Sequence, residues 1–233
     1  MYVYGKNSCE EILNSKKSIN KVFLDKNFND KDIISIIEKR NIKPIFYNKM
    51  QLDELADGLH QGIIVDIGDF RYCDIDDIIR DNGFIVVLDH LEDTHNFGAI
   101  IRTCDAAGVD GIIIPKDRSV SVNSTVMKTS SGAAIRVKIA QVTNINQTLS
   151  YLKDRGYWIF STDMNGTNYT EGDYKTSTCL VIGNEGKGVS ELVKKSSDFI
   201  VSIPMIGKIE SLNASVAAGI LIYEVVRQRS MKE

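Results

Sequence analysis

The stretch that most constrains the fold of this chain is residues 203–224, with the sequence IPMIGKIESLNASVAAGILIYE. After a polar loop, its second half is apolar or small on every side, which predicts a buried helix because no face suits water. Gly219 in mid-helix costs roughly 1 kcal/mol relative to Ala, so close packing against another element is expected there. Ser211 and Asn213 are favourable N-cap types, and a helix start suits an anionic group. The loop is therefore a candidate site, with a capped core helix as the alternative.

Composition and length narrow the class of protein. The chain has 233 residues, of which 43% are hydrophobic and 25% charged, so two domains or one domain with an appendage are expected. No apolar run approaches the length of a membrane span, and the start lacks a signal-peptide pattern, which predicts a cytoplasmic protein without membrane contact. The four cysteines and three histidines are scattered, so neither a metal site nor a disulfide framework is expected.

The net charge of −3 hides an uneven distribution. Residues 1–50 hold ten Lys or Arg against six Asp or Glu, residues 51–83 hold two against nine, and residues 84–233 hold sixteen of each. A basic first segment can meet phosphate even in an acidic chain. Solvated lysines explain the same excess, so charge alone leaves RNA contact open.

Alternating strand and helix patterns over residues 1–68 predict a small α/β domain. Helices are expected at residues 8–13, 30–40 and 52–56, and strands at 22–24, 44–47 and 62–67. Residues 69–83 are acidic and punctuated by glycine, which predicts a linker with one short helix.

The strand–helix pattern starts again at Phe84 with FIVVLD, an apolar run typical of a strand buried on both faces. Strands and helices then alternate, which predicts an α/β domain with a largely parallel sheet. Ligands in such sheets lie beyond the carboxyl ends of the strands, so the loops after Asp89, Thr162, Ile182 and Ile203 are candidate sites. The expected helices are 98–107, 123–129, 145–155, 190–195 and the C-terminal one, and the expected strands are 84–89, 111–114, 137–139, 157–162, 178–182 and 199–203.

Polar residues occupy these loops. Asn96 lies at the expected start of a helix, and Arg102 follows six residues later. Arginine cannot act as a free base at ordinary pH, but its fork of donors can hold a phosphate or steady an alkoxide. The alternative without a functional role is that Asn96 is a helix N-cap and Arg102 a surface arginine.

The loop GNEGKG at residues 183–188 resembles nucleotide-binding loops but matches neither type. A dinucleotide fingerprint needs GxGxxG, and a P-loop needs Ser or Thr after its lysine, where this chain has Gly188. Neither NAD nor ATP is supported. The glycines allow the backbone to approach a ligand closely, with Glu185 at the end of a strand.

Three motifs in order, NFGAIIRT from Asn96, VIGNEGKG and IPMIGKIESLNASVAAGILIYE, resemble those of the SpoU family of RNA 2'-O-methyltransferases within the SPOUT class. The resemblance covers residues 84–233. Residues 1–68, with YGKN near the start and HQG at 60–62, resemble the ribosomal-protein-like substrate-binding domain of bacterial 23S rRNA guanosine 2'-O-methyltransferases. The resemblance implies a catalytic domain with a parallel sheet and a deep trefoil knot, made by the 183–213 region, and a homodimer.

The resemblance also implies S-adenosyl-L-methionine as cofactor, RNA rather than DNA as substrate, and no metal. Arg102 would act at the ribose 2'-hydroxyl, either by orienting a phosphate that serves as base or by stabilising the alkoxide. The residues that would build and orient this site are Asn96, Glu185, Ser211 and Asn213. The residues that would hold the cofactor are Thr162, Gly183, Ile203, Met205 and Leu212.

Other functions stay open from the sequence alone. The chain could methylate tRNA instead of 23S rRNA, or it could be a non-catalytic RNA-binding ribosome assembly factor, although the intact motif residues argue against the latter. An α/β oxidoreductase is disfavoured by the failed dinucleotide fingerprint.

Overall fold

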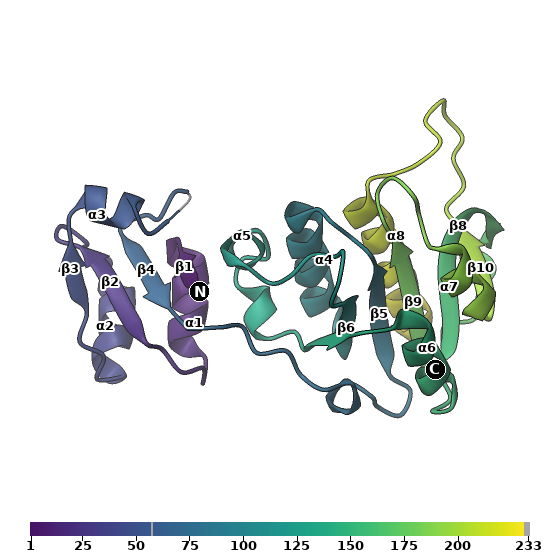
Figure 1. Cartoon of the computed structure of the whole chain (residues 1–233), viewed down its shortest axis with the longest axis horizontal. Helices are drawn as coiled ribbons and strands as arrows, with labels where there is room; N and C mark the ends of the chain where they lie inside the picture. The colour runs from purple at the N-terminus through teal and green to yellow at the C-terminus, as the bar shows by residue number, and fades with distance from the viewer. Residues whose placement is uncertain (57, 231–233) are drawn as a thin grey trace. The chain divides into compact units, whose positions relative to one another are not determined.

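The computed structural model describes residues 1–56 and 58–230, and the chain divides into two compact units. Unit 1 comprises Met1–Arg71 together with Val122–Arg136, and unit 2 comprises Tyr72–Ser121 and Val137–Glu233 (Figure 1). The sequence assigns all of residues 84–233 to one domain, whereas in the structure the segment 122–136 groups with the N-terminal unit.

Unit 1 is built on a four-stranded sheet in the order β1-β4-β2-β3. β4 is antiparallel to both β1 and β2, and β2 is parallel to β3. The carboxyl ends of β1, β2 and β3 therefore lie at the same edge as the start of β4. The elements are β1 (Tyr2–Tyr4), α1 (Lys6–Asn14), β2 (Lys21–Asp25), α2 (Lys31–Lys39), β3 (Ile45–Tyr47), α3 (Lys49–Asp53) and β4 (Ile63–Asp66).

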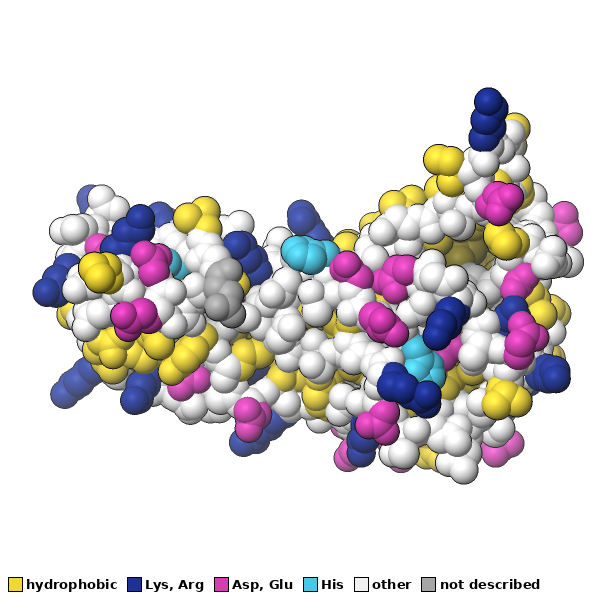
Figure 2. Space-filling view, turned by 45° about the horizontal axis from the view of Figure 1, so that its top comes forward, with side chains coloured by type: hydrophobic (Ala, Val, Ile, Leu, Met, Phe, Trp, Pro, Cys, Tyr) yellow, Lys and Arg dark blue, Asp and Glu magenta, His cyan; other side chains and the backbone are white. Residues whose placement is uncertain are grey.

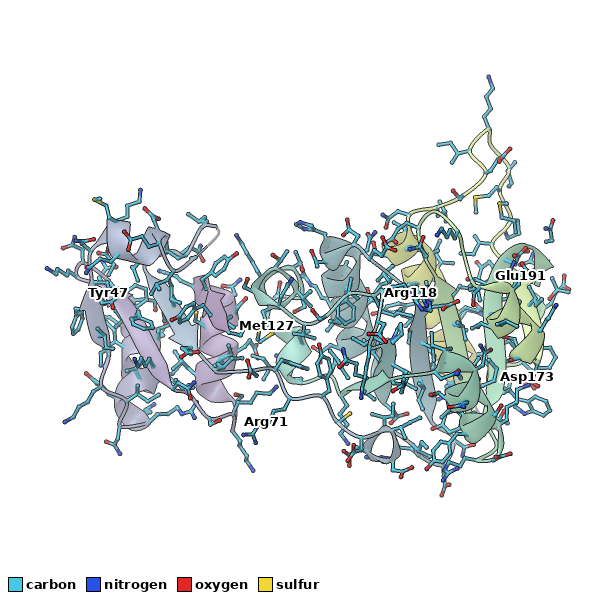
Figure 3. The ribbon with its side chains drawn as sticks, viewed as in Figure 1. Tyr47, Arg71, Arg118, Met127, Asp173 and Glu191 are labelled. Carbon is cyan, nitrogen blue, oxygen red and sulfur yellow. The ribbon has the colours of Figure 1, made fainter. Side chains whose placement is uncertain are left out.

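The segment that joins unit 1 from later in the chain carries helix α5 (Ser124–Thr129) and the short helix η2 (Ala133–Ile135). The Ser8 hydroxyl of α1 donates to the carbonyl of Met127, 3.3 Å away, and Met127 is fully buried (Figure 3). Glu11 forms an ion pair with Arg136. Apolar burial and polar contacts thus attach this segment to the first helix.

Unit 2 is built on a six-stranded sheet in the order β10-β8-β9-β5-β6-β7, and every pairing in it is parallel. The largely parallel α/β sheet expected from the sequence is confirmed. The elements are η1 (Ile75–Asp77), β5 (Phe84–Asp89), α4 (Thr94–Ala107), β6 (Gly111–Pro115), β7 (Ile139–Val142), α6 (Ile145–Lys153), β8 (Trp158–Asn168), η3 (Tyr169–Glu171), β9 (Thr178–Gly183), α7 (Glu191–Ser196), β10 (Phe199–Ser202) and α8 (Ala214–Ser230).

Helices cover both faces of this sheet (Figure 1). Ile85 and Val87 of β5 pack in one buried cluster with Leu149 of α6 and Val193 of α7. Since side chains alternate along a strand, the intervening residues of β5 point to the opposite face, where α4 and α8 pack together. Burial on both faces explains why the strands of this sheet are continuous apolar runs.

Several element boundaries differ from the sequence expectations. Helix α3 begins at Lys49 rather than at residue 52, because Asn48 and Gln51 form a reciprocal capping box. Helix α4 begins at Thr94, because the Asp93 carboxylate accepts from the first free backbone N–H groups, including that of Asn96 at 2.8 Å. Asn96 is therefore a residue of the first turn, and not the cap.

The expectation that α8 is buried on every side is wrong for the single chain. One face packs on the unit through Ala218, Leu221 and Val225, but Val216 and Tyr223 on the other face are each 50% exposed. A Cβ added at Gly219 would meet no atom of the described residues within 4 Å. The close packing predicted at this glycine is therefore absent within the described part of the chain. No helix in the described part of the chain is long and apolar enough to cross a membrane.

Candidate functional site

A cavity of about 370 Å³ lies in unit 2 at the carboxyl ends of β8, β9 and β10. Its volume falls within the range of small-molecule sites. All five residues that the resemblance assigned to cofactor binding line it, together with Glu185 and Ser211 of the expected catalytic set. The lining residues are Thr162, Asp163, Met164, Ile182, Gly183, Asn184, Glu185, Gly186, Lys187, Gly188, Val201, Ser202, Ile203, Met205, Glu210, Ser211, Leu212, Ala214, Ala217 and Leu221.

One wall of the cavity is the turn that follows β9. Asn184 and Gly188 exchange backbone hydrogen bonds of 3.1 and 2.9 Å, and the Asn184 carboxamide oxygen accepts from the amides of Gly186 and Lys187. A Cβ on Gly183 would lie 2.1 Å from the carbonyl carbon of Gly188. Only glycine fits at this position, since the turn folds directly back over it.

Another wall is the loop between β10 and α8, residues 203–213, which extends from the unit (Figure 1). It carries apolar side chains that its own unit does not cover, including Ile206, which is fully exposed, and Ile209. Figure 2 shows apolar side chains on the projecting loop, with a hollow at its base. Met205 and Leu212, at the two ends of the loop, line the cavity with Ala214 of α8.

Three residues far apart in the sequence meet beside the cavity. The Asn96 side-chain amide donates to the Glu185 carboxylate at 3.0 Å, and the Asn213 amide donates to the Asn96 carboxamide oxygen at 3.0 Å. The remaining Asn213 oxygen accepts from the backbone N–H of Ser215 at the start of α8. The Glu185 carboxylate therefore lies near the N-termini of α4 and α8, whose partial positive charge favours an anion.

Asp89, at the end of β5, is a structural support that the sequence analysis did not single out. It is 1% exposed, and its carboxylate accepts from the backbone N–H of Ser190 at 2.7 Å and lies 2.6 Å from Nδ1 of His90. The Asn184 amide donates to the His90 carbonyl at 2.8 Å. Asp89 and Asn184 thus attach the turn after β9 to the strand before α4. The sequence feature that could have identified Asp89 is an acidic residue at the end of an apolar strand.

Arg102 is the expected catalytic residue that the structure does not bring to the cavity. It lies on the exposed surface of α4, two turns from the helix start, and does not line the cavity. Six residues along a helix place it roughly 120° around the axis from Asn96. Its guanidinium has no hydrogen bond or ion pair with any other described residue, so its donors are available to a ligand.

Asp163 is a charged group in the cavity wall whose pKa is shifted. Lys194 of α7 donates to it at 2.5 Å and holds the pKa of this carboxyl below its ordinary value. The pKa of Lys194 is raised in turn, by Asp163 first and by Glu191 second. The pair therefore stays ionised at neutral pH. Among residues 1–56 and 58–230, no group of three or more His, Cys, Asp or Glu side chains could hold a metal ion.

The lining of the cavity suits a nucleoside that carries a positive charge. Ile182, Ile203 and Leu212 offer apolar contact for a base, and glycine backbone at residues 183–188 allows close approach. Glu210 adds a carboxylate that can accept hydrogen bonds from ribose hydroxyls or face a cation, whereas the Asp163 carboxylate is paired with Lys194. These features match the binding requirements of a sulfonium nucleoside.

Sequence comparisons identify two family segments in the chain. The sequence model described as the SpoU rRNA Methylase family matches residues 83–223, and that described as RNA 2'-O ribose methyltransferase substrate binding matches residues 2–73. A Bacillus subtilis (strain 168) protein assigned to the TrmH family of tRNA/rRNA methyltransferases is 40% identical over 239 residues, which cover 98% of this chain and 96% of that protein. A Staphylococcus saprophyticus protein with the same assignment is 41% identical over 238 residues, with the same coverage.

Solved structures agree with these matches. The SpoU methyltransferase AviRb from Streptomyces viridochromogenes has a TM-score of 0.88 at 26% identity, over 99% of this chain and 90% of that one. The crystal structure of AviRb in complex with AdoMet has a TM-score of 0.86 at 24% identity, over 100% and 91% of the two chains. A TrmH/SpoU tRNA modifying enzyme from A. aeolicus is 36% identical over 67% of this chain and 79% of that one, with a TM-score of 0.59.

Proposed function

The chain belongs to the SpoU family of RNA 2'-O-methyltransferases, and from this membership we propose that it methylates a ribose 2'-hydroxyl of ribosomal RNA at the site described above. The cofactor is S-adenosyl-L-methionine, which supplies an electrophilic methyl group when bound. The observation that carries the site assignment is the hydrogen-bonded series Glu185–Asn96–Asn213 beside the cavity. It joins all three sequence motifs at one place.

The chain's own residues account for the requirements of this reaction. A ribose hydroxyl is a weak nucleophile, so it must be placed, its proton must be accepted and the developing oxyanion must be stabilised. Apolar side chains and glycine backbone of the cavity hold the adenosine and orient the sulfonium. We propose that the hydrogen-bonded side chains of Asn96, Glu185 and Asn213 orient the RNA beside the cavity, and that Ser211, which lies in the cavity wall, contributes to this site.

Arg102 is proposed as the residue that acts on the RNA, although it does not line the cavity of its own chain. Its permanently charged guanidinium, which has no partner among the described residues, can hold a phosphate that accepts the hydroxyl proton, or stabilise the alkoxide directly. The methyl group forms a bond to the ribose oxygen as its bond to sulfur breaks, and the sulfur leaves as a neutral thioether. No metal is required by this scheme.

The test of the function begins with cofactor binding. Calorimetry should show S-adenosylmethionine binding to the whole chain and no binding of NAD, since the loop at 183–188 lacks the dinucleotide pattern. Mapping of ribose methyl groups in RNA from a strain lacking the protein should then reveal one absent modification. A large-subunit rRNA guanosine is the expected target, and loss from a tRNA would replace that assignment. An unchanged map would favour the non-catalytic assembly factor.

Arg102→Ala should bind S-adenosylmethionine as tightly as the original protein and lose methyl transfer by roughly 100-fold or more. The measurement is single-turnover transfer of a labelled methyl group to total RNA from the deletion strain, with calorimetry as the control for cofactor affinity. Undiminished transfer by the variant would remove Arg102 from the mechanism.

We further propose that the active protein is a homodimer. The support is the exposed apolar face of α8, with Val216 and Tyr223 half exposed and Gly219 open to close approach. A second copy is the partner that would supply the packing which the small residues of this helix predict. The deep knot implied by family resemblance is likewise a proposal. RNA as substrate makes the cytoplasm the proposed location.

A further inference from the structure

A second cavity, of about 640 Å³, lies in unit 1. We propose that this cavity binds the base of an unpaired nucleotide in the RNA that the enzyme methylates. The inference rests on the proposed function, because it assumes that unit 1 engages RNA. Beyond that function, it names this cavity as the place on unit 1 that contacts the RNA. It also names an unpaired nucleotide as the feature of the RNA that is recognised there. The lining residues are Lys6, Asp25, Asn27, Phe28, Asn29, Lys49, Asp53, Ala56, Gly58, Leu59, His60, Gln61 and Gly62.

The topology of the sheet explains why one cavity collects residues from four parts of the chain. Lys6 follows β1, Phe28 lies in the loop after β2, Lys49 follows β3 and Gln61 precedes β4. Because β4 is antiparallel to its neighbours, all four connections meet at one edge of the sheet. Loops at the carboxyl ends of parallel strands are a common location for binding sites.

Phe28 supplies an aromatic face to the cavity. A Cβ added at Gly62, which has a φ of +83°, would lie 3.0 Å from Cδ2 of the Phe28 ring, so glycine is what lets the ring lie against the backbone there. The Lys6 ammonium lies 5.6 Å from the centre of the ring. A ring supported in this way is a platform on which a base of any sequence can stack.

Fixed polar groups surround the ring. Nδ1 of His60 accepts from the Gly62 backbone N–H at 2.9 Å, which leaves the proton on Nε2, and this nitrogen donates to Asp53 at 3.0 Å. Asp25 accepts from the backbone N–H of Asn27 at 2.8 Å. Each carboxylate keeps one oxygen that has no partner in the described part of the chain. These oxygens can accept from the amino or imino groups of a base.

The amide side chains complete the set of donors. Gln61 accepts from the Lys6 backbone N–H at 2.8 Å, which orients its amide nitrogen as a donor. Asn27 and Asn29 also line the cavity. Donors and acceptors around an aromatic ring match the edge of a nucleobase, which carries both.

The lysines of the cavity differ in their availability. Lys6 forms an ion pair with Asp30 at 2.8 Å, whereas Lys49 has no ion-pair or hydrogen-bond partner among residues 1–56 and 58–230. Figure 2 shows basic side chains, Lys or Arg, interspersed with acidic ones over the visible face of unit 1. Because the positive charges of its two lysines are balanced by the carboxylates of Asp25 and Asp53, the cavity is not a site for several phosphates. Lys49 is the one positioned for the phosphate attached to a bound base.

An unpaired nucleotide, rather than a duplex, follows from this geometry. Bases inside a helix present only their edges in the grooves, and they cannot place a ring face against Phe28 or enter a concave cavity. A bulged or loop nucleotide presents both its face and its edge.

The experiment measures binding of the full-length protein to five RNA hairpins with the same stem. Four carry a single bulged A, C, G or U, and the fifth is fully paired. We expect at least one bulged hairpin to bind about tenfold more tightly than the paired one, the size of one stacking contact. Phe28→Ala should remove that preference. Phe46→Ala is the matched control, because Phe46 is 58% exposed on β3 and does not line the cavity.

A second pair of variants guards against misfolding of Phe28→Ala. Lys49→Ala removes an exposed side chain that has no partner among residues 1–56 and 58–230, and it should weaken binding of the preferred bulged hairpin about threefold to tenfold, lower its salt dependence and affect the fully paired hairpin less. Lys43→Ala, an exposed lysine of the same unit outside the cavity, should have less effect. Thermal unfolding checks that each variant is folded.

The inference is overturned if the original protein binds all five hairpins equally, or if Phe28→Ala keeps the preference for a bulge. Its failure can be told apart from failure of the proposed function. A protein that methylates RNA but shows no bulge preference keeps the function and loses the cavity assignment. A protein that shows the preference but transfers no methyl group keeps the cavity assignment and loses the function.

Discussion

Asn96 connects the three loops of the site because a carboxamide both donates and accepts. Its amide nitrogen faces Glu185 and its oxygen faces Asn213. An aspartate at this position would place a second carboxylate against Glu185, and a leucine would leave both partners without their bonds. The sequence showed the residue types in order, but the joint use of both ends of one side chain is a property of the folded chain.

Gly183 is the position at which a side chain is least tolerated in the site. Gly183→Ala would force its Cβ into the backbone at Gly188, and we expect a loss of about 1–3 kcal/mol in the free energy of unfolding. Gly186→Ala is the control, since among the described residues the nearest atom to its Cβ would be the Asn184 carboxamide oxygen at 3.7 Å. Denaturant unfolding of both variants checks this, and equal stabilities would show that the turn can move away from β9.

At the scale of single elements, α8 joins the site to the rest of unit 2 through a polar end. Glu224, which is buried, accepts from Arg227 and from the Gln228 amide, and Gln228 in turn bonds to the backbone of Gly172 and Tyr174. The hydrogen bonds from Arg227 first, and from Gln228, hold the pKa of Glu224 below its ordinary value of 4.5. A helix with an apolar middle is thus held at its far end by charge-assisted hydrogen bonds.

This network makes stability depend on pH in a defined direction. The folded-state pKa of Glu224 is lowered, so its stabilisation is fully present above about pH 4.5 and is lost as the pH falls through the lowered folded value. Glu224→Gln should be less stable at pH 7 by about 1.5 kcal/mol, and the difference should shrink below pH 4. Thermal unfolding at pH 7, 5 and 3.5 measures this. A constant difference at all three values would mean that the charge of Glu224 does not contribute.

The exposed face of α8 gives a test of the proposed homodimer. Tyr223→Glu places a charge in the centre of that face, and we expect a dimer in the original protein and a monomer in the variant by sedimentation equilibrium. Tyr2→Glu, a similarly exposed tyrosine on β1 of unit 1, is the control and should leave the dimer intact. A monomeric original protein would contradict the proposal.

At the scale of the whole molecule, the chain enters unit 1 twice. It returns at Val122–Arg136, after the first two strands of the sheet of unit 2. Val126 and Met127 of the returning helix are fully buried, and the Lys128 ammonium lies 5.3 Å from the centre of the Tyr4 ring. Unit 1 is therefore completed by residues 122–136, and these residues separate the two stretches of chain that form unit 2.

This interleaving changes what a truncation should do. From sequence alone, removal of residues 1–68 is expected to leave a folded dimer with weak RNA binding. Because α5 packs against the removed strand and helix, we expect the truncated chain to retain S-adenosylmethionine binding but to bind a hydrophobic dye and to unfold at a lower temperature. Val126→Ser with Met127→Ser in the truncated chain should reduce the dye signal. A truncated chain as stable as the original would contradict this account.

The sequence by itself determined the local and periodic features of this protein. The apolar runs predicted the strands of a parallel sheet, and the polar loops predicted where the residues of the candidate site lie. Three ordered motifs predicted the family. These succeed because burial and capping act over a few neighbouring residues. The start of α3, the start of α4 and the length of β8 differ because competing caps and sheet partners decide them.

Only the tertiary structure decided which distant groups meet. The bridge from Glu185 through Asn96 to Asn213, the buried support at Asp89, the open face of α8 and the cavity around Phe28 join residues tens of positions apart. No periodicity encodes such contacts, because they depend on the order of strands in the sheet and on which loops share an edge. That order is set by packing of the whole unit.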